Sequence, residues 1–413
     1  MLHEKGVGIS YNLFVLRAVK LIKHSLVAIF VVIIFFSCRN GTQAKINMMA
    51  HEAVEMGPIT LDSARMKQGI LYHRLDSLFS RRHALNGFNG NVLILKGGRV
   101  MYKGCFGYCN YADKDTLTVQ TAFQIASSSK PFTSSAILKL VQDGKLALTD
   151  TLGKFFPGFP YRGITVQMLL CHRSGLPNYL YFGERLWKNR KSYMINDSLV
   201  DILMRNRNIE GTTRAGTHFQ YNNTNFALLA SVVEKVTGKH FPDYMKETFF
   251  GPLGMKHTWV RDVQNDKEER KHALSYNSAW KIQAEDPYDG VYGDKNVFST
   301  MEDMMIWDRA FYDETNISSA MQQEAYTPRS FEQRGTRNYG YGWRLMKQPN
   351  GQNLVYHNGW WHGNNTVFYR YMPDTFALII LSNRYYQGVY DVQPVFNLIG
   401  ATKDTTAWKE EEQ

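Results

Sequence analysis

The segment 123–150 carries a serine and a lysine whose spacing suits nucleophilic catalysis. It reads FQIASSSKPFTSSAILKLVQDGKLALTD, with small polar residues ahead of an apolar helical stripe. Pro131 suits a first helical turn, where its missing N–H is not needed, so we expect the helix to begin close to Ser127. Lys130 follows three residues after Ser127, on the same face of such a turn. In a turn shielded from water, the lysine amine could take the serine proton, and the helix N-terminus could stabilise an oxyanion.

An isolated S-x-x-K pattern also fits a Ser-rich helix cap followed by a surface lysine. The other patterns of the sequence must therefore distinguish a catalytic pair from such a cap. The stretch FQYNNTNF places Tyr221 and Asn223 two residues apart just before a helix, where both side chains can face one cleft. The stretch VYHNGWWHGN describes a strand that runs into His357 and Gly359. Glycine there lets the backbone of a substrate approach the strand edge.

The three patterns, S-x-x-K, Y-x-N and H-x-G, occur in the order that is typical of the β-lactamase-related serine hydrolases, which the sequence resembles. That family includes class C β-lactamases, D-Ala-D-Ala carboxypeptidases, D-aminopeptidases and family VIII esterases. The resemblance covers most of residues 85–400. Beyond the motifs it rests on the phrases LLCHRSGLPNY, FQYNNTNFALLASVVEKVTGK, FGPLGMKHT and GVYGDKNVFSTMEDMMIW.

The resemblance implies catalytic roles for three residues. Ser127 would be the acylated nucleophile and Lys130 its proton acceptor. Tyr221 would pass the proton to the leaving group and activate the deacylating water. The alternative for Tyr221 is a place in an aromatic cluster. The resemblance implies no metal and no cofactor.

The resemblance also implies binding roles around the nucleophile. Asn223 would hold the substrate amide, and the third motif contributes His357 and Gly359. The backbone N–H groups of Ser127 and Trp360 would form the oxyanion hole. The alternatives are that Asn223 is the N-cap of its helix and that His357 is a strand histidine with satisfied hydrogen bonds.

The third motif departs from the usual [KH]-[TS]-G of the family. Asn358 lacks the hydroxyl that helps to bind a substrate carboxylate, and His357 is mostly neutral at pH 7. We therefore expect short-chain esters to be better substrates than penicillins, with Asn358→Thr restoring carboxylate binding most clearly below pH 6.5, where His357 would gain charge. Trp360 and Trp361 stand where smaller residues are commoner and predict a narrower or more apolar mouth.

The order of predicted elements indicates an α+β protein. An amphipathic helix, a hairpin that turns at Gly97 and Gly98, and a long helical middle precede four closely spaced strands and a closing helix. Short connections favour an antiparallel sheet, which the early hairpin could join. The resemblance implies a β-lactamase/transpeptidase-like fold, with helices from both chain ends on the sheet and the active site in the cleft beside a mostly helical lobe. The predicted ranges are helices 61–85, 222–237, 299–314 and 390–400 and strands 91–113 (the hairpin), 272–276, 339–346, 353–358, 365–372 and 376–382.

The N-terminal segment predicts export. Residues 25–37 form an apolar run of 13 residues that ends at Cys38, short for a membrane span and suited to a signal peptide. We expect a lipoprotein-type signal over residues 1–37, lipidation of Cys38, a tether over 38–60, the hydrolase domain over 61–400 and a polar tail over 401–413. The alternative is an uncleaved N-terminal anchor. Both place the domain in the cell envelope, facing the periplasm or the cell surface.

The composition and the cysteines exclude several classes. The net charge of +11 is scattered, without basic runs among aromatics or zinc-finger spacing, so no nucleic-acid partner is expected. Cys105 and Cys109 lie in a predicted strand with Cα atoms roughly 13 Å apart, too far for a disulfide. With Cys171 they are expected to be buried thiols. The absence of G-x-S-x-G excludes an α/β-hydrolase esterase.

Two functions remain open at this point. The first is a membrane-anchored serine hydrolase that cleaves amide or ester bonds in a small-molecule or peptide substrate, such as a peptidoglycan stem peptide, a D-amino-acid peptide or a small ester. The second is a catalytically weak or inactive sensor or binding domain on the same fold.

Overall fold

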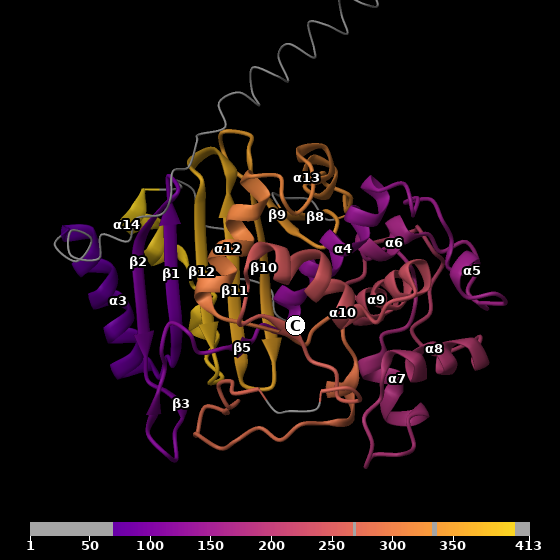
Figure 1. Cartoon of the computed structure of the whole chain (residues 1–413), viewed down its shortest axis with the longest axis horizontal. Coiled ribbons are helices and arrows are strands. Elements are labelled where there is room, and N and C mark those ends of the chain that lie inside the picture. The colour runs from indigo at the N-terminus through magenta and orange to yellow at the C-terminus, as the bar shows by residue number, and fades with distance from the viewer. Residues whose placement is uncertain (1–68, 267–269, 333–336, 401–413) are drawn as a thin grey trace, which may run out of the picture. The chain divides into compact units, whose positions relative to one another are not determined.

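Seven strands form one antiparallel sheet in the computed structural model, which describes residues 69–266, 270–332 and 337–400. The early hairpin pairs with the last strand of the chain, so the order across the sheet is β2-β1-β12-β11-β10-β9-β8 (Figure 1). Gly97 and Gly98 join the hairpin with φ values of 57° and 69°, which suit a two-residue turn. The strands are β1 Gly90–Lys96, β2 Arg99–Phe106, β8 Arg337–Tyr339, β9 Arg344–Lys347, β10 Asn353–Trp361, β11 Asn364–Tyr371 and β12 Phe376–Ser382.

Helices cover both faces of this sheet. The α-helices are α3 Ile70–Asn86, α4 Lys130–Gln142, α5 Leu152–Phe155, α6 Val166–Leu170, α7 Tyr179–Leu186, α8 Asn196–Arg205, α9 Asn223–Thr237, α10 Phe241–Met245, α11 Gly251–Leu253, α12 Met301–Tyr312, α13 Ser319–Ala325 and α14 Gln393–Ile399. Along β1, Val92 and Ile94 belong to a core that includes α3 and α14, whereas Leu93 and Leu95 face α4 and α12. Helices α5–α10 gather beside the β8–β10 side of the sheet (Figure 1). The α+β class with an antiparallel sheet is therefore confirmed.

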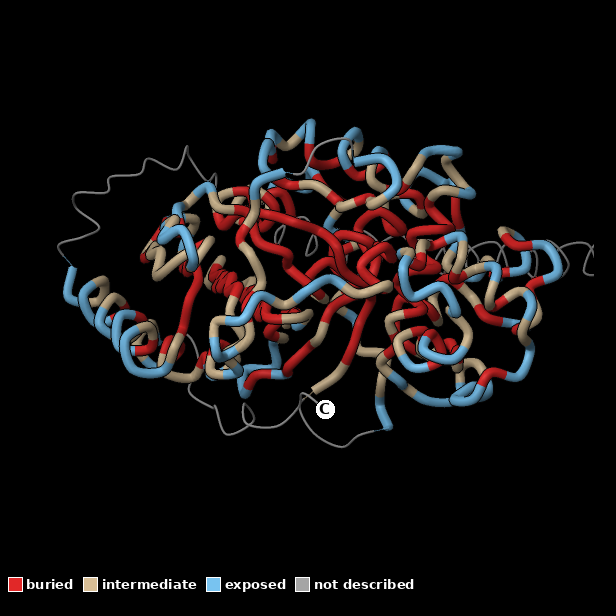
Figure 2. Tube along the Cα trace, turned by 90° about the horizontal axis from the view of Figure 1, so that it is seen from below, coloured by how far each residue is buried: buried red, intermediate tan, exposed pale blue. Residues whose placement is uncertain are grey.

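A second, three-stranded sheet leads into the predicted nucleophile. Its order is β5-β7-β6, and β5 ends two residues before the short helical turn η1 (Ala126–Ser129) that precedes α4. The remaining short elements are β3 Tyr108–Asn110, β4 Asp115–Thr116, β5 Phe123–Gln124, β6 Trp259–Val260, β7 Val297–Ser299, η2 Lys246–Phe250, η3 Pro287–Gly290, η4 Met372–Asp374 and η5 Gln387–Val389. Buried residues concentrate in the strands and in the helices that contact them (Figure 2).

The predicted helices 222–237 and 299–314 are confirmed as α9 and α12, and their ends show why. The side chain of Asn222 accepts a hydrogen bond from the N–H of Thr224 at 2.9 Å, and Gly238 ends α9 with a φ of 67°. Thr300 caps α12 by accepting from the N–H of Asp303 at 3.1 Å.

Two strand predictions are wrong. Residues 272–276 form no strand, because their N–H groups bond to three different segments, at Ala122, Cys109 and Asn383, and so cannot build one ladder. The predicted strand 339–346 is a hairpin, β8 and β9, because Gly342 turns the chain with a φ of 74°. A Cβ at Gly342 would lie 2.6 Å from the Cβ of Ser134, so this turn packs directly on α4.

The remaining predictions divide between the described and undescribed parts of the chain. Cys109 and Cys171 are buried and unpaired as expected, but Cys105 is only partly buried. In the described ranges, no helix is both long enough and apolar enough to cross a membrane. The predicted signal peptide, Cys38, the tether and the polar tail lie outside the described residues.

Candidate active site

The S-x-x-K pattern forms a compact turn with the two side chains in contact. Ser127 lies in η1 and is partly exposed, whereas Lys130 begins α4 and is fully buried. Nζ of Lys130 lies 2.9 Å from Oγ of Ser127. Ala126, directly before the serine, is buried with a φ of 49°, a left-handed conformation that a residue with a side chain rarely adopts. Such strain persists only where the surrounding structure holds it, and it is common at functional sites.

The neighbouring serines hold this turn in place. Oγ of Ser128 lies 3.0 Å from Oγ1 of Thr366 in β11. Oγ of Ser129 accepts a hydrogen bond at 3.1 Å from the N–H of Val297 in β7. The turn is therefore tied to both sheets, and Ser127 is the serine of the three whose hydroxyl faces Lys130.

Three acceptors from distant parts of the chain surround the Lys130 amine. Besides Ser127, Nζ lies 2.8 Å from Oδ1 of Asn223 and 2.9 Å from the carbonyl oxygen of Asp294. No carboxylate in the described part of the chain forms an ion pair with Lys130. Because Lys130 is fully buried, the alternative of a surface lysine is wrong.

Asn223 and Tyr221 both reach this amine. Asn222, not Asn223, is the N-cap of α9, which leaves the Asn223 carboxamide free to contact Lys130. The centre of the Tyr221 ring lies 4.9 Å from Nζ of Lys130 and 4.4 Å from the centre of the His172 ring. Tyr221 thus belongs to an aromatic cluster and also adjoins the Ser127–Lys130 pair.

His357 is buried and neutral. Its Nδ1 donates to the carbonyl oxygen of Asn358 at 2.7 Å, and its Nε2 lies 3.2 Å from the hydroxyl of Tyr339. Burial lowers the pKa of His357 well below its usual value, and the positive charges of Arg344 and Lys130 lower it further. The expectation that His357 gains charge just below pH 6.5 is therefore wrong. Both ring nitrogens have partners, as in the strand-histidine alternative.

Strand β10 packs directly against the Ser127 turn. Among the described residues, β9 pairs with β10 only as far as Tyr356, and the part of β10 that follows contains His357 and Gly359. At Gly359, an added Cβ would lie 2.4 Å from the carbonyl oxygen of Ile125 and 3.1 Å from the backbone nitrogen of Ser127. Glycine is thus required for this close approach. It places the backbone of Gly359 and Trp360 beside the N–H of Ser127.

The two tryptophans at the end of β10 differ in exposure. The side chain of Trp360 is 48% exposed, and its indole N–H donates to the carbonyl oxygen of His362 at 3.0 Å. Trp361 donates to Oδ1 of the buried Asp289 at 2.6 Å, and Nε2 of His362 lies 2.9 Å from Oδ2. Burial disfavours the charge of Asp289, but the hydrogen bonds from His362 and Trp361 outweigh it and lower the pKa of that carboxyl. Asp289 therefore fixes the end of β10.

Among the described residues, one cluster has ligand types that could hold a metal ion. Asp286, Asp289 and His362 place one ligand atom each within 4.8 Å of one another. The two oxygens of Asp289, however, already accept hydrogen bonds from Trp361, His362 and the N–H of Asp286. We therefore interpret the cluster as a hydrogen-bonded support for the end of β10.

Two neighbours of the site were missed from the sequence. Asp294 contacts Lys130 through its backbone carbonyl oxygen, and a backbone contact of this kind cannot be predicted from the residue type. Arg344 lies opposite Tyr356 in the β9–β10 register, and its guanidinium carbon is 5.2 Å from the centre of the Tyr221 ring. The register between β9 and β10 cannot be predicted from the sequence. The guanidinium of Arg344 nevertheless brings positive charge to the site.

Gly359→Ala should impair the site more than the fold. The added methyl would push β10 away from the Ser127 turn, and a displacement of about 1 Å at a reacting centre can cost on the order of a hundredfold in rate. We expect a loss of that size in ester turnover. Gly153→Ala is the matched control, because its nearest neighbour would be 3.9 Å away. Wild-type turnover in Gly359→Ala would show that the close approach is not needed, and a thermal unfolding curve checks that both variants fold.

Comparison with known proteins identifies the family of this chain. The Beta-lactamase family model matches residues 75–397. Penicillin-binding protein 4* of Bacillus subtilis is 34% identical over 333 residues, which are 77% of this chain and 73% of that protein. A penicillin-binding protein from Bacillus halodurans superposes with a TM-score of 0.68 at 25% identity, over 80% of this chain and 99% of that one. The D-amino acid amidase of Ochrobactrum anthropi SV3, complexed with L-phenylalanine amide, gives 0.64 at 25% identity, over 80% and 97%. The chain therefore belongs to the Beta-lactamase family, with the penicillin-binding-like fold of its serine hydrolases.

Proposed function

We propose that this protein hydrolyses amide or ester bonds through an acyl-enzyme on Ser127. The observation that carries the proposal is the buried Lys130 amine, 2.9 Å from the Ser127 hydroxyl. The names of its relatives, penicillin-binding proteins and a D-amino acid amidase, support acyl-transfer chemistry on amides. Family membership supports serine hydrolysis in general, and the steps below are specific to this site.

In the first step, Lys130 accepts the proton of Ser127. A neutral amine has one lone pair and two N–H groups. The two N–H groups can donate to Asn223 and to the carbonyl oxygen of Asp294, which leaves the lone pair for the Ser127 hydroxyl. The serine oxygen then bonds to the substrate carbonyl carbon, whose oxygen becomes an oxyanion. The N–H groups of Ser127 and Trp360 stabilise that oxyanion.

In the second step, the tetrahedral intermediate collapses and the bond to the leaving group breaks. Tyr221, beside Lys130, gives the leaving group a proton and is reprotonated from Lys130. A water molecule then attacks the acyl-enzyme while Tyr221 takes its proton and passes its own proton to the neutral Lys130. When the acyl bond breaks, Lys130 returns that proton to the Ser127 oxygen, which restores the hydroxyl and the neutral amine. Asn223 contacts Lys130 through Oδ1, so its amide N–H groups are available for the substrate carbonyl.

Covalent labelling with a fluorophosphonate tests the nucleophile. Ser127→Ala should abolish labelling, whereas Ser128→Ala, the matched control, should still be labelled, because its hydroxyl contacts Thr366 and not Lys130. Lys130→Ala and Tyr221→Phe should each lower turnover by on the order of a hundredfold or more. Full labelling of Ser127→Ala would assign the nucleophile to another residue. An unlabelled wild type would favour the alternative of a binding or sensor domain.

The geometry of the third motif supports uncharged substrates. Asn358 has no hydroxyl, and its Oδ1 is buried without a hydrogen-bond donor from the described residues. His357 is buried, neutral and fully hydrogen-bonded, so it provides no charge for a substrate carboxylate. We therefore propose short-chain esters and neutral amides as better substrates than penicillins.

Comparison of kcat/KM for p-nitrophenyl esters and nitrocefin tests this preference. Asn358→Thr should shift the ratio toward the carboxylate-bearing substrate by roughly tenfold, as for one charge-assisted hydrogen bond. Because the pKa of His357 is lowered, its ring is neutral both above and below pH 6.5, and the shift should be the same at pH 6 and pH 8. Efficient nitrocefin hydrolysis by the wild type, unchanged in Asn358→Thr, would place carboxylate recognition elsewhere.

We also propose that a lipid on Cys38 anchors the enzyme in the cell envelope. Support comes from the apolar run of residues 25–37 that ends at this cysteine. The mature wild-type chain should begin at Cys38 and partition into detergent, and Cys38→Ser should either keep its signal or become soluble. A mature N-terminus at any other residue would contradict lipidation.

A further inference from the structure

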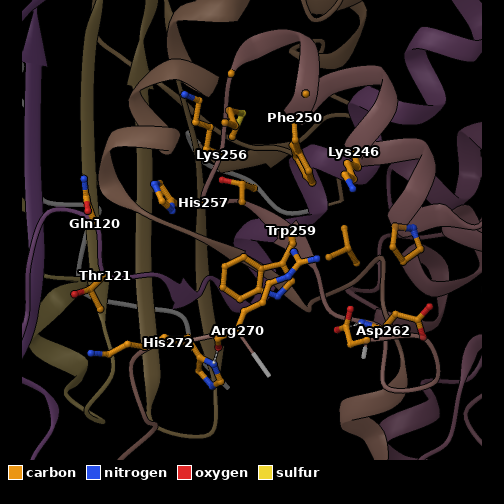
Figure 3. Close-up of a pocket in the computed structure, with 18 of the residues that line it drawn as sticks. Gln120, Thr121, Lys246, Phe250, Lys256, His257, Trp259, Asp262, Arg270 and His272 are labelled. Carbon is orange, nitrogen blue, oxygen red and sulfur yellow. Dashed lines mark hydrogen bonds between the residues drawn. The ribbon is translucent and has the colours of Figure 1, made fainter. Parts of the chain in front are cut away.

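The described part of the chain buries two lysines, and the proposed steps use only one of them. Lys130 is 0% exposed and Lys295 is 3% exposed. Lysines are almost never buried without partners, and those that line the hollow over β6, such as Lys246 and Lys256, are exposed in the usual way (Figure 3). The burial of Lys295 therefore indicates a role inside the molecule, and its neighbours lie beside Lys130.

The hydroxyl of Tyr179 links Lys295 to the carboxylate of Asp294. Nζ of Lys295 donates to this hydroxyl at 2.5 Å and to the carbonyl oxygen of Val291 at 3.1 Å. The Tyr179 hydroxyl has one proton, which it donates to Oδ2 of Asp294 at 2.8 Å. Nζ of Lys295 itself lies 3.8 Å from the same Oδ2, so the two buried side chains also form an ion pair. The Asp294 carboxylate is thus held by a phenol from α7 and by the amine of the next residue.

Asp294 is fixed at two of its atoms. Its backbone oxygen accepts from Nζ of Lys130 at 2.9 Å, and its carboxylate contacts Tyr179 and Lys295. The other carboxylate oxygen, Oδ1, is buried with no hydrogen-bond donor among the described residues. A buried carboxylate without a donor or a cation would be strongly destabilising, so Tyr179 and Lys295 determine how residue 294 is turned. They thereby determine whether its carbonyl oxygen faces Lys130.

Lys295 also contacts the strand end that carries the second oxyanion donor. Its Nζ lies 4.8 Å from the centre of the Trp361 ring, close enough for a cation–π interaction. The indole N–H of Trp361 is held by Asp289. Trp361 follows Trp360, whose N–H is the proposed partner of Ser127 in the oxyanion hole. One side chain therefore packs against supports of both the base and the oxyanion hole.

The charges of the two buried lysines interact. Burial lowers the pKa of Lys295 below its usual value, and the positive charge of Lys130 lowers it further. The carboxylates of Asp294, Asp289 and Asp286 oppose this shift and favour the ammonium of Lys295. The interaction between two charges is mutual, so this ammonium also disfavours a proton on Lys130. It thus favours the neutral amine that the first step requires.

Other titratable and charged side chains surround the two amines. They are Tyr179, Tyr221, His172, His357, His362, Arg344, Asp286, Asp289 and Asp294. Burial lowers the pKa of His172 and of His357 well below the usual value, so both rings are neutral. Arg344 lies over the ring of Tyr221. Lys295 is therefore the cation whose removal changes the charge at Asp294, the residue that both lysines contact.

We propose that Lys295 is a positioning residue for the Ser127 reaction. Together with Tyr179 it turns the Asp294 carbonyl toward Lys130, and its charge favours the neutral form of that amine. Lys295 itself exchanges no proton with Ser127. This role rests on the proposed function, since it concerns the proton transfer from Ser127 to Lys130.

The rate of fluorophosphonate labelling, measured against pH on the full chain in detergent, tests this role. Labelling needs only the first step, and its rate falls at low pH, where Lys130 becomes protonated. Lys295→Met removes a positive charge near Lys130, so this fall should move to higher pH by roughly one unit. A purely structural role of Lys295 would lower the rate at every pH without moving the fall.

Tyr179→Phe keeps both charges and removes only the bridging hydroxyl, so it decides the question if a thermal unfolding curve shows that Lys295→Met does not fold. Without the hydroxyl, Asp294 loses the donor that holds its carboxylate. We expect labelling at high pH to slow by about tenfold, as for one lost hydrogen bond. Labelling of Tyr179→Phe at the wild-type rate would overturn the proposed role.

Lys145→Met is the matched control, because Lys145 is exposed beyond the end of α4 and its loss removes the same charge. It should label with the pH dependence of the wild type. The role of Lys295 is overturned if Lys295→Met leaves the fall at its wild-type pH, or if Lys145→Met moves it equally. An unlabelled wild type would instead contradict the Ser127 mechanism on which this role rests.

Discussion

The candidate site depends on one buried amine and the three oxygens that surround it. Nζ of Lys130 contacts Oγ of Ser127, Oδ1 of Asn223 and the carbonyl oxygen of Asp294, which come from three separate parts of the chain. A buried ammonium or amine without such partners would be strongly destabilising, because its polar groups would lose their hydrogen bonds to water. The contacts that satisfy Lys130 therefore also fix the nucleophile, the start of α9 and the segment before β7 relative to one another.

The second constraint is the close approach between β10 and the Ser127 turn. Gly359 has no room for a side chain, and the strained backbone of Ala126 is held between this strand and the small sheet. Among the described residues, no strand pairs with β10 beyond Tyr356 on its β9 side. The close approach at Gly359 thus brings two backbone segments together where an oxyanion would form.

Local chemistry accounts for what the sequence could predict. The contact between Ser127 and Lys130 needs only one helical turn, and the ends of α9 and α12 depend on neighbouring capping residues, so all three were predictable. Long-range register was not: no residue type marks the carbonyl of Asp294 or the position of Arg344.

Two predictions were wrong because the surroundings of the residues could not be predicted: the charge of His357 and the strand at residues 272–276. His357 stands in a motif position, but its neighbours Tyr339 and Arg344 and its complete burial decide its charge. The segment 272–276 has the composition of a strand, yet its N–H groups bond to three different segments. The family resemblance supplied the order of the motifs and the fold, whereas the physical state of each side chain required the structure.

The central claim is that Ser127 carries the acyl group. Its most direct test is peptide mass spectrometry of Tyr221→Phe, quenched in acid shortly after mixing with a p-nitrophenyl ester. The p-nitrophenolate leaving group does not need a proton from Tyr221, so acylation should proceed while hydrolysis of the acyl-enzyme is slowed. The account predicts an acyl adduct on the peptide that contains Ser127. An adduct on a different residue, or turnover of the ester without any adduct, would contradict it.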